Sequence, residues 1–177
     1  MARHLFYVLA LLLFTSFSVA QSSDHVAVFG GYSYMNPEFT STASGGVSGW
    51  NASATFKLVR YVGVVADFSG FSPSGGGASA SYQTITGGPQ VSVRIGRIEP
   101  FAHFLIGITH GTLTHRDEPN GNDFNSLTYG GGGGVDIGLN RWLAVRGQVD
   151  GLHIGSNFAN GQASSVARVS TGLVFRF

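Results

Sequence analysis

The stretch that decides the fold is VARVSTGLVFRF, residues 166–177. Apolar side chains alternate in it with charged or small ones, which is typical of a β-strand whose two faces meet different surroundings. A domain in water usually ends on polar residues that fray. An apolar, aromatic last strand therefore indicates that one face of this strand contacts something other than water. The apolar face consists of Val169, Thr171, Leu173, Phe175 and Phe177, and the opposite face carries Arg168, Ser170, Gly172 and Arg176.

The same period of two recurs through the rest of the chain. It predicts eight strands in all, and the fifth of them is the most apolar and the least clearly two-sided. The composition, with 27 glycines and 12% aromatic residues, also suits strands better than helices. The predicted strands are residues 25–34, 49–57, 61–70, 83–95, 100–110, 127–139, 142–153 and 166–177.

The connections between these strands alternate in length. Short turns are predicted at residues 58–60, 96–99 and 140–141, and longer polar loops at 35–46, 72–81, 111–126 and 155–164. Short turns at one rim and long loops at the other are typical of outer-membrane barrels, and an even strand number brings both termini to the short-turn rim. The predicted fold is an all-β, eight-stranded antiparallel transmembrane β-barrel.

Composition narrows the classes of function. Charged residues are only 11% of the chain, against roughly 25% in average proteins. The net charge of +1 gives no electrostatic reason to expect nucleic acid as a partner. Cysteine is absent, which excludes disulfides, thiolate metal ligands and a cysteine nucleophile. We expect no cofactor.

The N-terminus has the pattern of an export signal. A short basic start is followed by an apolar run at residues 5–17, and Ser18 and Ala20 supply small residues before a predicted cleavage at Gln21. The run is shorter than the roughly 20 residues that a membrane-spanning helix needs. We therefore expect residues 1–20 to be a cleaved signal peptide and residues 21–177 to be the barrel domain.

Charged residues within the predicted strands share one face. In lipid the outer face of a barrel must be apolar, so this charged face is predicted to point inward. An eight-stranded barrel has an interior only just wide enough for side chains, and an unpaired buried charge is very unfavourable. We therefore expect a plugged polar lumen in which Asn51, Gln90 and Gln148 complete the hydrogen bonding. The predicted lumen network consists of Lys57, Asp67, Arg94, Asp136, Arg146, Asp150, Arg168 and Arg176.

Tyrosine and tryptophan residues gather near the predicted strand ends. These side chains favour the membrane interface, where the ring is in apolar surroundings and its polar tip reaches water. The alternative is that aromatic residues simply suit strands. The residues predicted to form such girdles are Tyr32, Tyr34, Trp50, Tyr61, Tyr82, Tyr129 and Trp142.

Several segments together resemble one protein family. They are VFGGYSYMN, GWNASATF with VGVVADFSG, EPFAHFLIGITHG, GGGGVDIGLNRWLAVRGQVDGLH and VSTGLVFRF, in this order. The chain resembles the outer-membrane β-barrel domain family, related to the small barrels of outer-membrane proteins A and X. The resemblance implies a cell outer membrane of Gram-negative type. Unlike outer-membrane protein A, the chain is not expected to carry a peptidoglycan-binding domain after the barrel. It also implies that Val169, Leu173, Phe175 and Phe177 form the signal read by the outer-membrane assembly machinery.

Sites of catalysis or metal binding are not supported by the residue patterns. The five glycines at residues 130–134 lack the Lys and Ser/Thr of a phosphate loop and are expected to relieve crowding within a strand. No histidine pair has the spacing of a zinc motif; His103 and His110, an odd number of residues apart, should face opposite sides of one strand. The acidic loop around Asp117 lacks the ligand order of a calcium loop.

One enzymatic alternative is a lipid A deacylase. Some eight-stranded outer-membrane barrels are lipid A deacylases that use a His, a Ser and an acidic residue at the outer rim. Here His153 and Ser156 are three residues apart instead of two, and no Asp or Glu follows Asp150. The elements of a nucleophile, a base and an orienting acid are therefore incomplete.

The sequence thus favours a non-catalytic barrel that serves as a structural element or surface-interaction scaffold. Its partners would be outer-membrane lipids, the assembly machinery and an unknown ligand of the four long loops, because function on such scaffolds usually lies in loops. A narrow porin-like channel for small solutes is the first alternative, and a lipid A-modifying enzyme is the second.

Overall fold

The computed structural model describes residues 25–37, 46–72, 74–75, 78–115, 118–155 and 164–177. The predicted signal peptide lies outside these residues. Within them the chain forms eight long strands and a two-residue strand, β4 (Ser74–Gly75). No helix in this described part is long and apolar enough to cross a membrane. The long strands are β1 (Val26–Pro37), β2 (Val47–Lys57), β3 (Val62–Phe71), β5 (Ala78–Ser92), β6 (Ile98–His115), β7 (Glu118–Gly138), β8 (Leu143–Ile154) and β9 (Ser164–Arg176).

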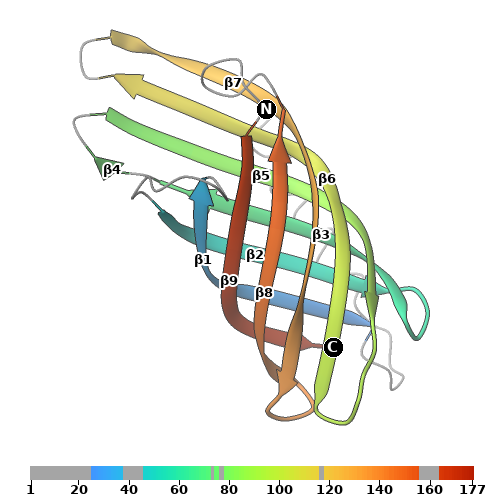
Figure 1. The fold of residues 1–177 in the computed structure, drawn as a ribbon. Coiled ribbons are helices and arrows are strands. Elements are labelled where there is room, and N and C mark those ends of the chain that lie inside the picture. The colour runs from blue at the N-terminus through green and yellow to red at the C-terminus, as the bar shows by residue number, and fades with distance from the viewer. Residues whose placement is uncertain (1–24, 38–45, 73, 76–77, 116–117, 156–163) are drawn as a thin grey trace, which may run out of the picture.

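The strands close into a barrel (Figure 1). Each long strand pairs antiparallel with its neighbours in the chain, β1 pairs with β9, and a pairing between β3 and β5 passes over the short β4. At the short-turn rim, Val26 and Phe177 exchange two backbone hydrogen bonds of 2.9 and 3.3 Å, so the first and last strands meet there. The predicted eight-stranded antiparallel barrel is confirmed.

Side chains alternate strictly between the interior and the outer surface. Along β8, alternate residues from Ala144 to Ile154 are buried and those between them are half-buried or exposed. The exposed positions on the outer surface are largely apolar: Ile85, Ile106 and Val149 are 58%, 52% and 55% exposed. The buried positions include most of the charges. This arrangement is the inverse of a globular protein in water, where the apolar set is buried.

Two predicted loops are partly wrong. The loop expected at residues 72–81 contains β4, and β5 already begins at Ala78. Residues 111–126 were expected to form a long loop, but β6 continues to His115 and β7 begins at Glu118. Their backbones stay paired beyond Gly111, with a register irregularity between Leu113 and His115. β5 stays paired with β6 over the same stretch, from Ser81↔Thr112 to Ala78↔His115. Polar and turn-forming residues hid this extension because strands that project beyond the barrel need no apolar face. Figure 1 shows β6 and β7 reaching well past the ends of β8 and β9.

The opposite rim consists of tight turns, as predicted. The turn between β5 and β6 contains Gly96 with a φ of 64°, a left-handed conformation that glycine adopts without steric cost. Ile95 and Ile98 form an isolated bridge around it, so β5 itself ends at Ser92 rather than at the predicted residue 95. In the turn before β8, the Asn140 side-chain oxygen accepts hydrogen bonds from two backbone amides, both 2.8 Å long.

The interior is less uniformly polar than expected. One buried apolar cluster contains Val65, Leu105, Leu152, Ile154 and Val166, and Met35 packs against it. A second contains Ala27, Phe29, Ala144 and Val174. The charged side chains are therefore packed between apolar groups, which lowers the local dielectric and makes their pairing more important.

Candidate functional site: the charged interior of the barrel

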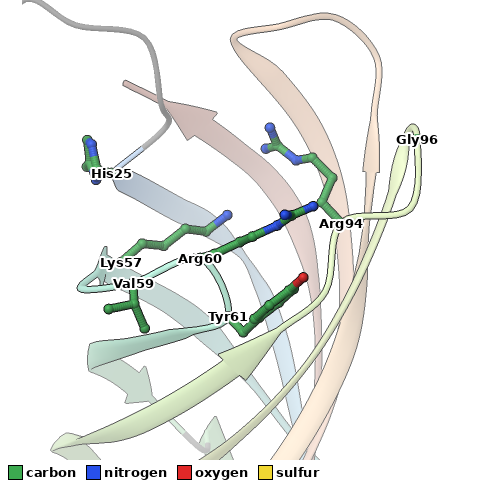
Figure 2. Close-up of a pocket in the computed structure, with 7 residues that line it drawn as sticks. All are labelled: His25, Lys57, Val59, Arg60, Tyr61, Arg94 and Gly96. Carbon is green, nitrogen blue, oxygen red and sulfur yellow. The ribbon is translucent and has the colours of Figure 1, made fainter.

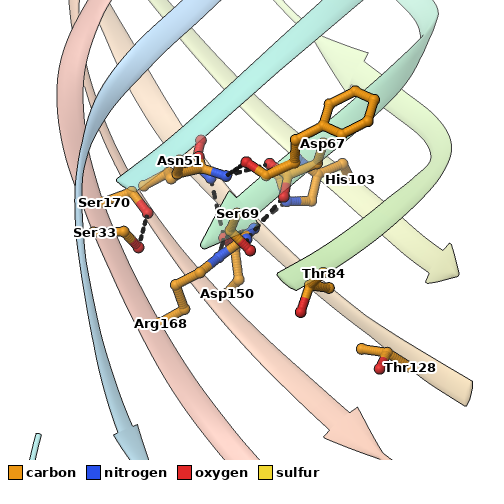
Figure 3. Close-up of polar contacts among 12 residues, drawn as sticks. Ser33, Asn51, Asp67, Ser69, Thr84, His103, Thr128, Asp150, Arg168 and Ser170 are labelled. Atoms are coloured by element: carbon orange, nitrogen blue, oxygen red, sulfur yellow. Dashed lines mark hydrogen bonds and ion pairs between the residues drawn. The ribbon is translucent and has the colours of Figure 1, made fainter. Parts of the chain in front are cut away.

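The most buried charged group is Arg168 on β9, whose residue is 0% exposed. Its Nη1 donates to Asp67 Oδ1 on β3 at 2.8 Å and to Ser69 Oγ at 3.1 Å. Its Nε and Nη2 both donate to Asp150 Oδ2 on β8, at 2.9 and 2.8 Å. One guanidinium thus joins strands from opposite parts of the barrel wall, because β3 and β9 are not neighbours in the sheet (Figure 3).

Neutral and titratable groups extend this network. His103 Nε2 lies 2.7 Å from Asp150 Oδ1, and Gln148 donates to the other oxygen of the same carboxylate at 3.0 Å. Asn51 Nδ2 donates to Asp67 Oδ2 at 2.9 Å. We call Asn51, Asp67, Ser69, His103, Gln148, Asp150 and Arg168 the central network. It includes His103, which sequence reasoning considered only as a possible metal ligand.

A second set of charges lies nearer the short-turn rim. Arg146 forms a two-bonded pair with Asp136, with distances of 2.7 and 2.9 Å. Arg176 Nη2 reaches both Asp136 Oδ2 at 3.4 Å and Glu99 Oε2 at 3.2 Å. Glu99 also accepts from Lys57. We call Lys57, Glu99, Asp136, Arg146 and Arg176 the rim network.

Two aromatic rings contact the Arg146 guanidinium. Its guanidinium carbon lies 4.3 Å from the centroid of the Phe101 ring and 5.2 Å from that of Phe29. Both rings are buried inside the barrel. A desolvated arginine gains from such cation–π contacts in addition to its ion pair. Nothing in the sequence pattern pairs Phe29 or Phe101 with this arginine.

The structure places seven of the eight predicted lumen residues in these two networks. The eighth, Arg94, donates from Nε to Glu99 Oε2 at 3.0 Å, but its side chain is 41% exposed and lies at the mouth of the barrel. Glu99 is the charged residue that sequence reasoning missed, because it was assigned to a turn. Its even spacing from Phe101 and His103, which also face inward, could have revealed it.

Charges inside the barrel balance in number. Among the side chains that the structure describes, four carboxylates are buried, Asp67, Glu99, Asp136 and Asp150, and the two networks contain four cations, Lys57, Arg146, Arg168 and Arg176. A balanced, hydrogen-bonded set avoids the large cost of an unpaired buried charge.

The glycine run makes room for the central network. A Cβ on Gly132 would lie 2.1 Å from Asp150 Oδ1, the oxygen that contacts His103. Gly131, in contrast, lies on the outer face, and its nearest neighbour would be a backbone oxygen at 3.3 Å. The glycines therefore relieve crowding inside a strand, as expected, and the crowding partner at Gly132 is an acidic side chain.

The aromatic residues lie close to both rims on the outer surface, with one exception. Tyr61 and Trp142 flank short turns, while Tyr32, Trp50 and Tyr129 lie toward the long-loop rim. The Trp50 indole covers Gly70 on the neighbouring strand. Tyr34 is also exposed on this side. Tyr82 is the exception: it shares the inward-facing parity of Thr84 and Thr86 and is half-buried, so its predicted place in a girdle is wrong.

The described part of the structure places no acidic side chain beside His153, which the enzymatic alternative requires. His153 Nδ1 lies 3.1 Å from Ser165 Oγ on the adjacent strand, and its ring packs on Tyr129 at 5.1 Å. Ser156, the predicted partner, lies outside the described residues. Each carboxylate whose side chain the structure describes is inside the barrel, whereas His153 and Ser165 lie on the outer face.

Histidines do not cluster with other metal ligands in the described part of the chain. His103 faces the interior, whereas His110 is exposed on the outer face and contacts Asn125 at 2.8 Å. The two lie on opposite sides of β6, as their spacing predicted.

The four residues assigned to an assembly signal lie together on the outer face of β9. Val169, Leu173, Phe175 and Phe177 are 50%, 43%, 49% and 63% exposed. Together with Thr171 they form a mostly apolar strip along the strand and its last residue, because outward positions on a strand recur at every second residue.

Solved structures with the same fold are small outer-membrane barrels. Neisserial surface protein A superposes with a TM-score of 0.73 at 11% identity, covering 89% of this chain and 100% of that one. Ail, the attachment invasion locus protein of Yersinia pestis, gives 0.58 at 16% identity over 86% and 96%. OprG from Pseudomonas aeruginosa gives 0.57 at 15% identity over 86% and 95%.

The sequence itself matches no protein-family model and no curated protein. At the identities above, the structural likeness establishes the fold alone. At that level the expected resemblance to small eight-stranded outer-membrane barrels is confirmed.

Proposed function

We propose that the chain is a non-catalytic integral barrel of the bacterial outer membrane, whose interior is sealed and whose long-loop end is an interaction scaffold. The observation that carries the membrane assignment is the apolar outer surface. Ile85, Ile106, Val149 and Val169 are each at least 50% exposed, and they lie on different strands around the barrel. A water-soluble monomer rarely exposes a contiguous apolar belt, whereas hydrocarbon requires one.

Export and insertion would follow from the two ends of the sequence. Residues 1–20 would direct the chain out of the cytoplasm. The outward strip of Val169, Leu173, Phe175 and Phe177 would be read by the outer-membrane assembly machinery before the strand contacts lipid. The fold shared with the Neisseria, Yersinia and Pseudomonas barrels supports this location.

Sealing of the lumen is supported by burial. Asp67, Asp150 and Arg168 are 1%, 1% and 0% exposed, so side chains fill the cross-section at the central network. Four buried polar atoms have no hydrogen-bond partner in the described part, among them His103 Nδ1 and Gln148 Oε1. Such atoms bind single waters readily, and this is the feature that favours the alternative of a narrow channel.

A scaffold role is supported by the shape of the long-loop end. The β6–β7 hairpin extends beyond the barrel wall and carries a polar sequence outward. Functional chemistry on rigid scaffolds is usually placed on such projecting segments. The Yersinia barrel of the same fold is named for attachment and invasion, which is consistent with a surface role.

Fractionation followed by gel mobility tests the proposal. The protein should be found with outer membranes, require detergent for extraction and migrate differently before and after boiling, because a closed barrel resists unfolding by detergent alone. Recovery in a soluble periplasmic fraction would contradict the membrane assignment. Unitary ion currents from the pure protein in planar bilayers would favour the channel, and loss of acyl chains from lipid A on expression would favour an enzyme.

A further inference from the structure

A cavity of about 640 Å³ opens at the short-turn end of the barrel (Figure 2). It lies between the turn that joins β2 to β3 and the turn that follows β5. Lys57, Arg60 and Arg94 supply positive charge to its wall, while Val59 and Tyr61 supply apolar surface. No carboxylate occurs among its described lining residues. The cavity is therefore a cationic mouth with one apolar side.

Among the described side chains at this mouth, the cations outnumber the carboxylates. Glu99 lies just inside and already accepts from Lys57, from Arg94 Nε at 3.0 Å and from Arg176 Nη2 at 3.2 Å. Arg60 adds a further cation. The Asp136 carboxylate is held by its two bonds to Arg146. Like charges gathered in a concave site raise the local potential for an anion, especially where low-dielectric walls focus the field.

The cations are held in place and are reachable from outside. The Arg60 guanidinium carbon lies 5.2 Å from the centroid of the Tyr61 ring, a cation–π contact that fixes the direction of a turn residue. The Lys57 and Arg94 side chains are 19% and 41% exposed. In Figure 2 Lys57 and Arg60 extend from one side of the opening toward the side that carries Arg94.

We propose that this cavity binds a phosphate group as a monoester or diester. A guanidinium presents a planar fork that matches phosphate oxygens, and a lysine adds a point charge, so groups from two turns can each bond a different oxygen. A bare ion would fill a small part of the volume, so the ligand carries further atoms. Its uncharged part would contact Val59 and Tyr61.

Two sources supply this chemistry. One is the headgroup of an anionic phospholipid in the leaflet next to the short turns, and the other is a soluble phosphate compound. The site needs only the barrel fold and its rim, so it is independent of whether the lumen is sealed or the long loops bind a partner.

Backbone amide NMR of the protein in maltoside micelles, which contain no phosphate, tests the site. Sodium phosphate at constant ionic strength and short-chain phosphatidylglycerol are titrated separately. We expect saturable shifts at residues 57–61 and 94–97. The Arg60→Gln/Arg94→Gln variant should bind roughly tenfold more weakly or worse, because two charge-assisted hydrogen bonds are lost. The single Arg60→Gln variant, on an exposed turn, should show a smaller loss.

Arg141→Gln is the matched control. Arg141 lies on another short turn, where its guanidinium carbon is 4.8 Å from the Trp142 ring, and it is not among the residues that line the cavity. Its removal should leave the affinity unchanged. Gel mobility before and after boiling verifies that every variant is folded, and a soluble protein would contradict the membrane proposal without bearing on this one.

The two titrations separate the sources. Saturation by both ligands shows that the phosphate group suffices, whereas saturation by the lipid alone identifies a headgroup site, which Val59→Ser should then weaken. Both results support the proposal. The absence of saturable shifts with either ligand, or an equal loss in Arg141→Gln, would overturn it.

Discussion

At the scale of single residues, Arg168 is the group on which the interior depends most. It is fully buried and joins Asp67 and Asp150. Arg168→Met should lower the free energy of unfolding by about 3–5 kcal/mol, because it leaves two buried carboxylates without their cation. The measurement is urea unfolding in lipid vesicles, followed by the fluorescence of Trp50 and Trp142.

The control for this prediction is Arg97→Ala, in an exposed turn, which should change stability by no more than about 0.5 kcal/mol. Adding Asp67→Asn and Asp150→Asn to the Arg168→Met variant should restore part of the loss, since it removes the stranded charges. A loss in Arg168→Met as small as that of the control would show that the central network is not a source of stability.

Gly132 gives a second prediction at this scale. A methyl group there would meet Asp150 Oδ1 at 2.1 Å and the Val149 backbone oxygen at 2.4 Å. Gly132→Ala should therefore cost about 1–3 kcal/mol, as other overpacking substitutions do. Gly147→Ala, where nothing lies within 4 Å of the added carbon, should be neutral or slightly stabilising in the same unfolding assay.

At the scale of strands, the sequence predicts the segments whose outer face must be apolar in lipid. All eight long strands were located because one face of each must be apolar, and a shift of one residue would turn every side chain to the wrong face. The β6–β7 extension beyond Gly111 was missed because it projects past the apolar belt, where no such rule applies.

The interior could be predicted only in part, for a related reason. Alternation tells which side a residue faces, so Asp67 and Arg168 could be placed inside from the sequence. It does not tell depth, so the separation into a central and a rim network needed the strand register. Leu105 and Leu152 went unassigned to the interior because an apolar residue is acceptable on either face of a membrane barrel.

The strands also allow a prediction about how deep each outward residue lies in the membrane. Val149 on β8 is opposite Val169 on β9, on the outer face and near the middle of its strand. Val149→Arg should destabilise folding into lipid vesicles by about 2–4 kcal/mol, whereas Val59→Arg in a short turn should cost about 1 kcal/mol or less, since the penalty for arginine falls toward the interface. Equal effects at the two positions would mean that this surface does not face hydrocarbon.

At the scale of the whole molecule, charge is distributed unequally along the barrel. Arg60, Arg97 and Arg141 occupy the three short turns, one in each, and two of them stack on a neighbouring aromatic ring. The acidic residues Glu118 and Asp123 lie in the hairpin at the opposite end. Such a separation favours one orientation of the barrel across a membrane whose two surfaces differ in charge.

The two networks also act in series along the axis, and this gives the last prediction. The central network closes the barrel at the level of Arg168. The rim network closes it again at the level of Arg146, whose guanidinium contacts the rings of Phe29 and Phe101. Removing either the Asp136–Arg146 pair of the rim network (Asp136→Ala/Arg146→Ala) or the three ion-paired groups of the central network (Asp67→Ala/Asp150→Ala/Arg168→Ala) should leave planar bilayers silent, because the other group still fills the interior.

Combining the two sets should open an ion path and produce unitary current steps in variants that still show heat-modifiable mobility. Paired groups are exchanged together because this leaves fewer unpaired buried charges, so the barrel has the best chance of remaining folded. Current from either variant alone would mean that a single network closes the interior. Current from the unmodified protein would mean that the waters bound by atoms such as Gln148 Oε1 already form a connected path, and the channel alternative would then replace the sealed scaffold.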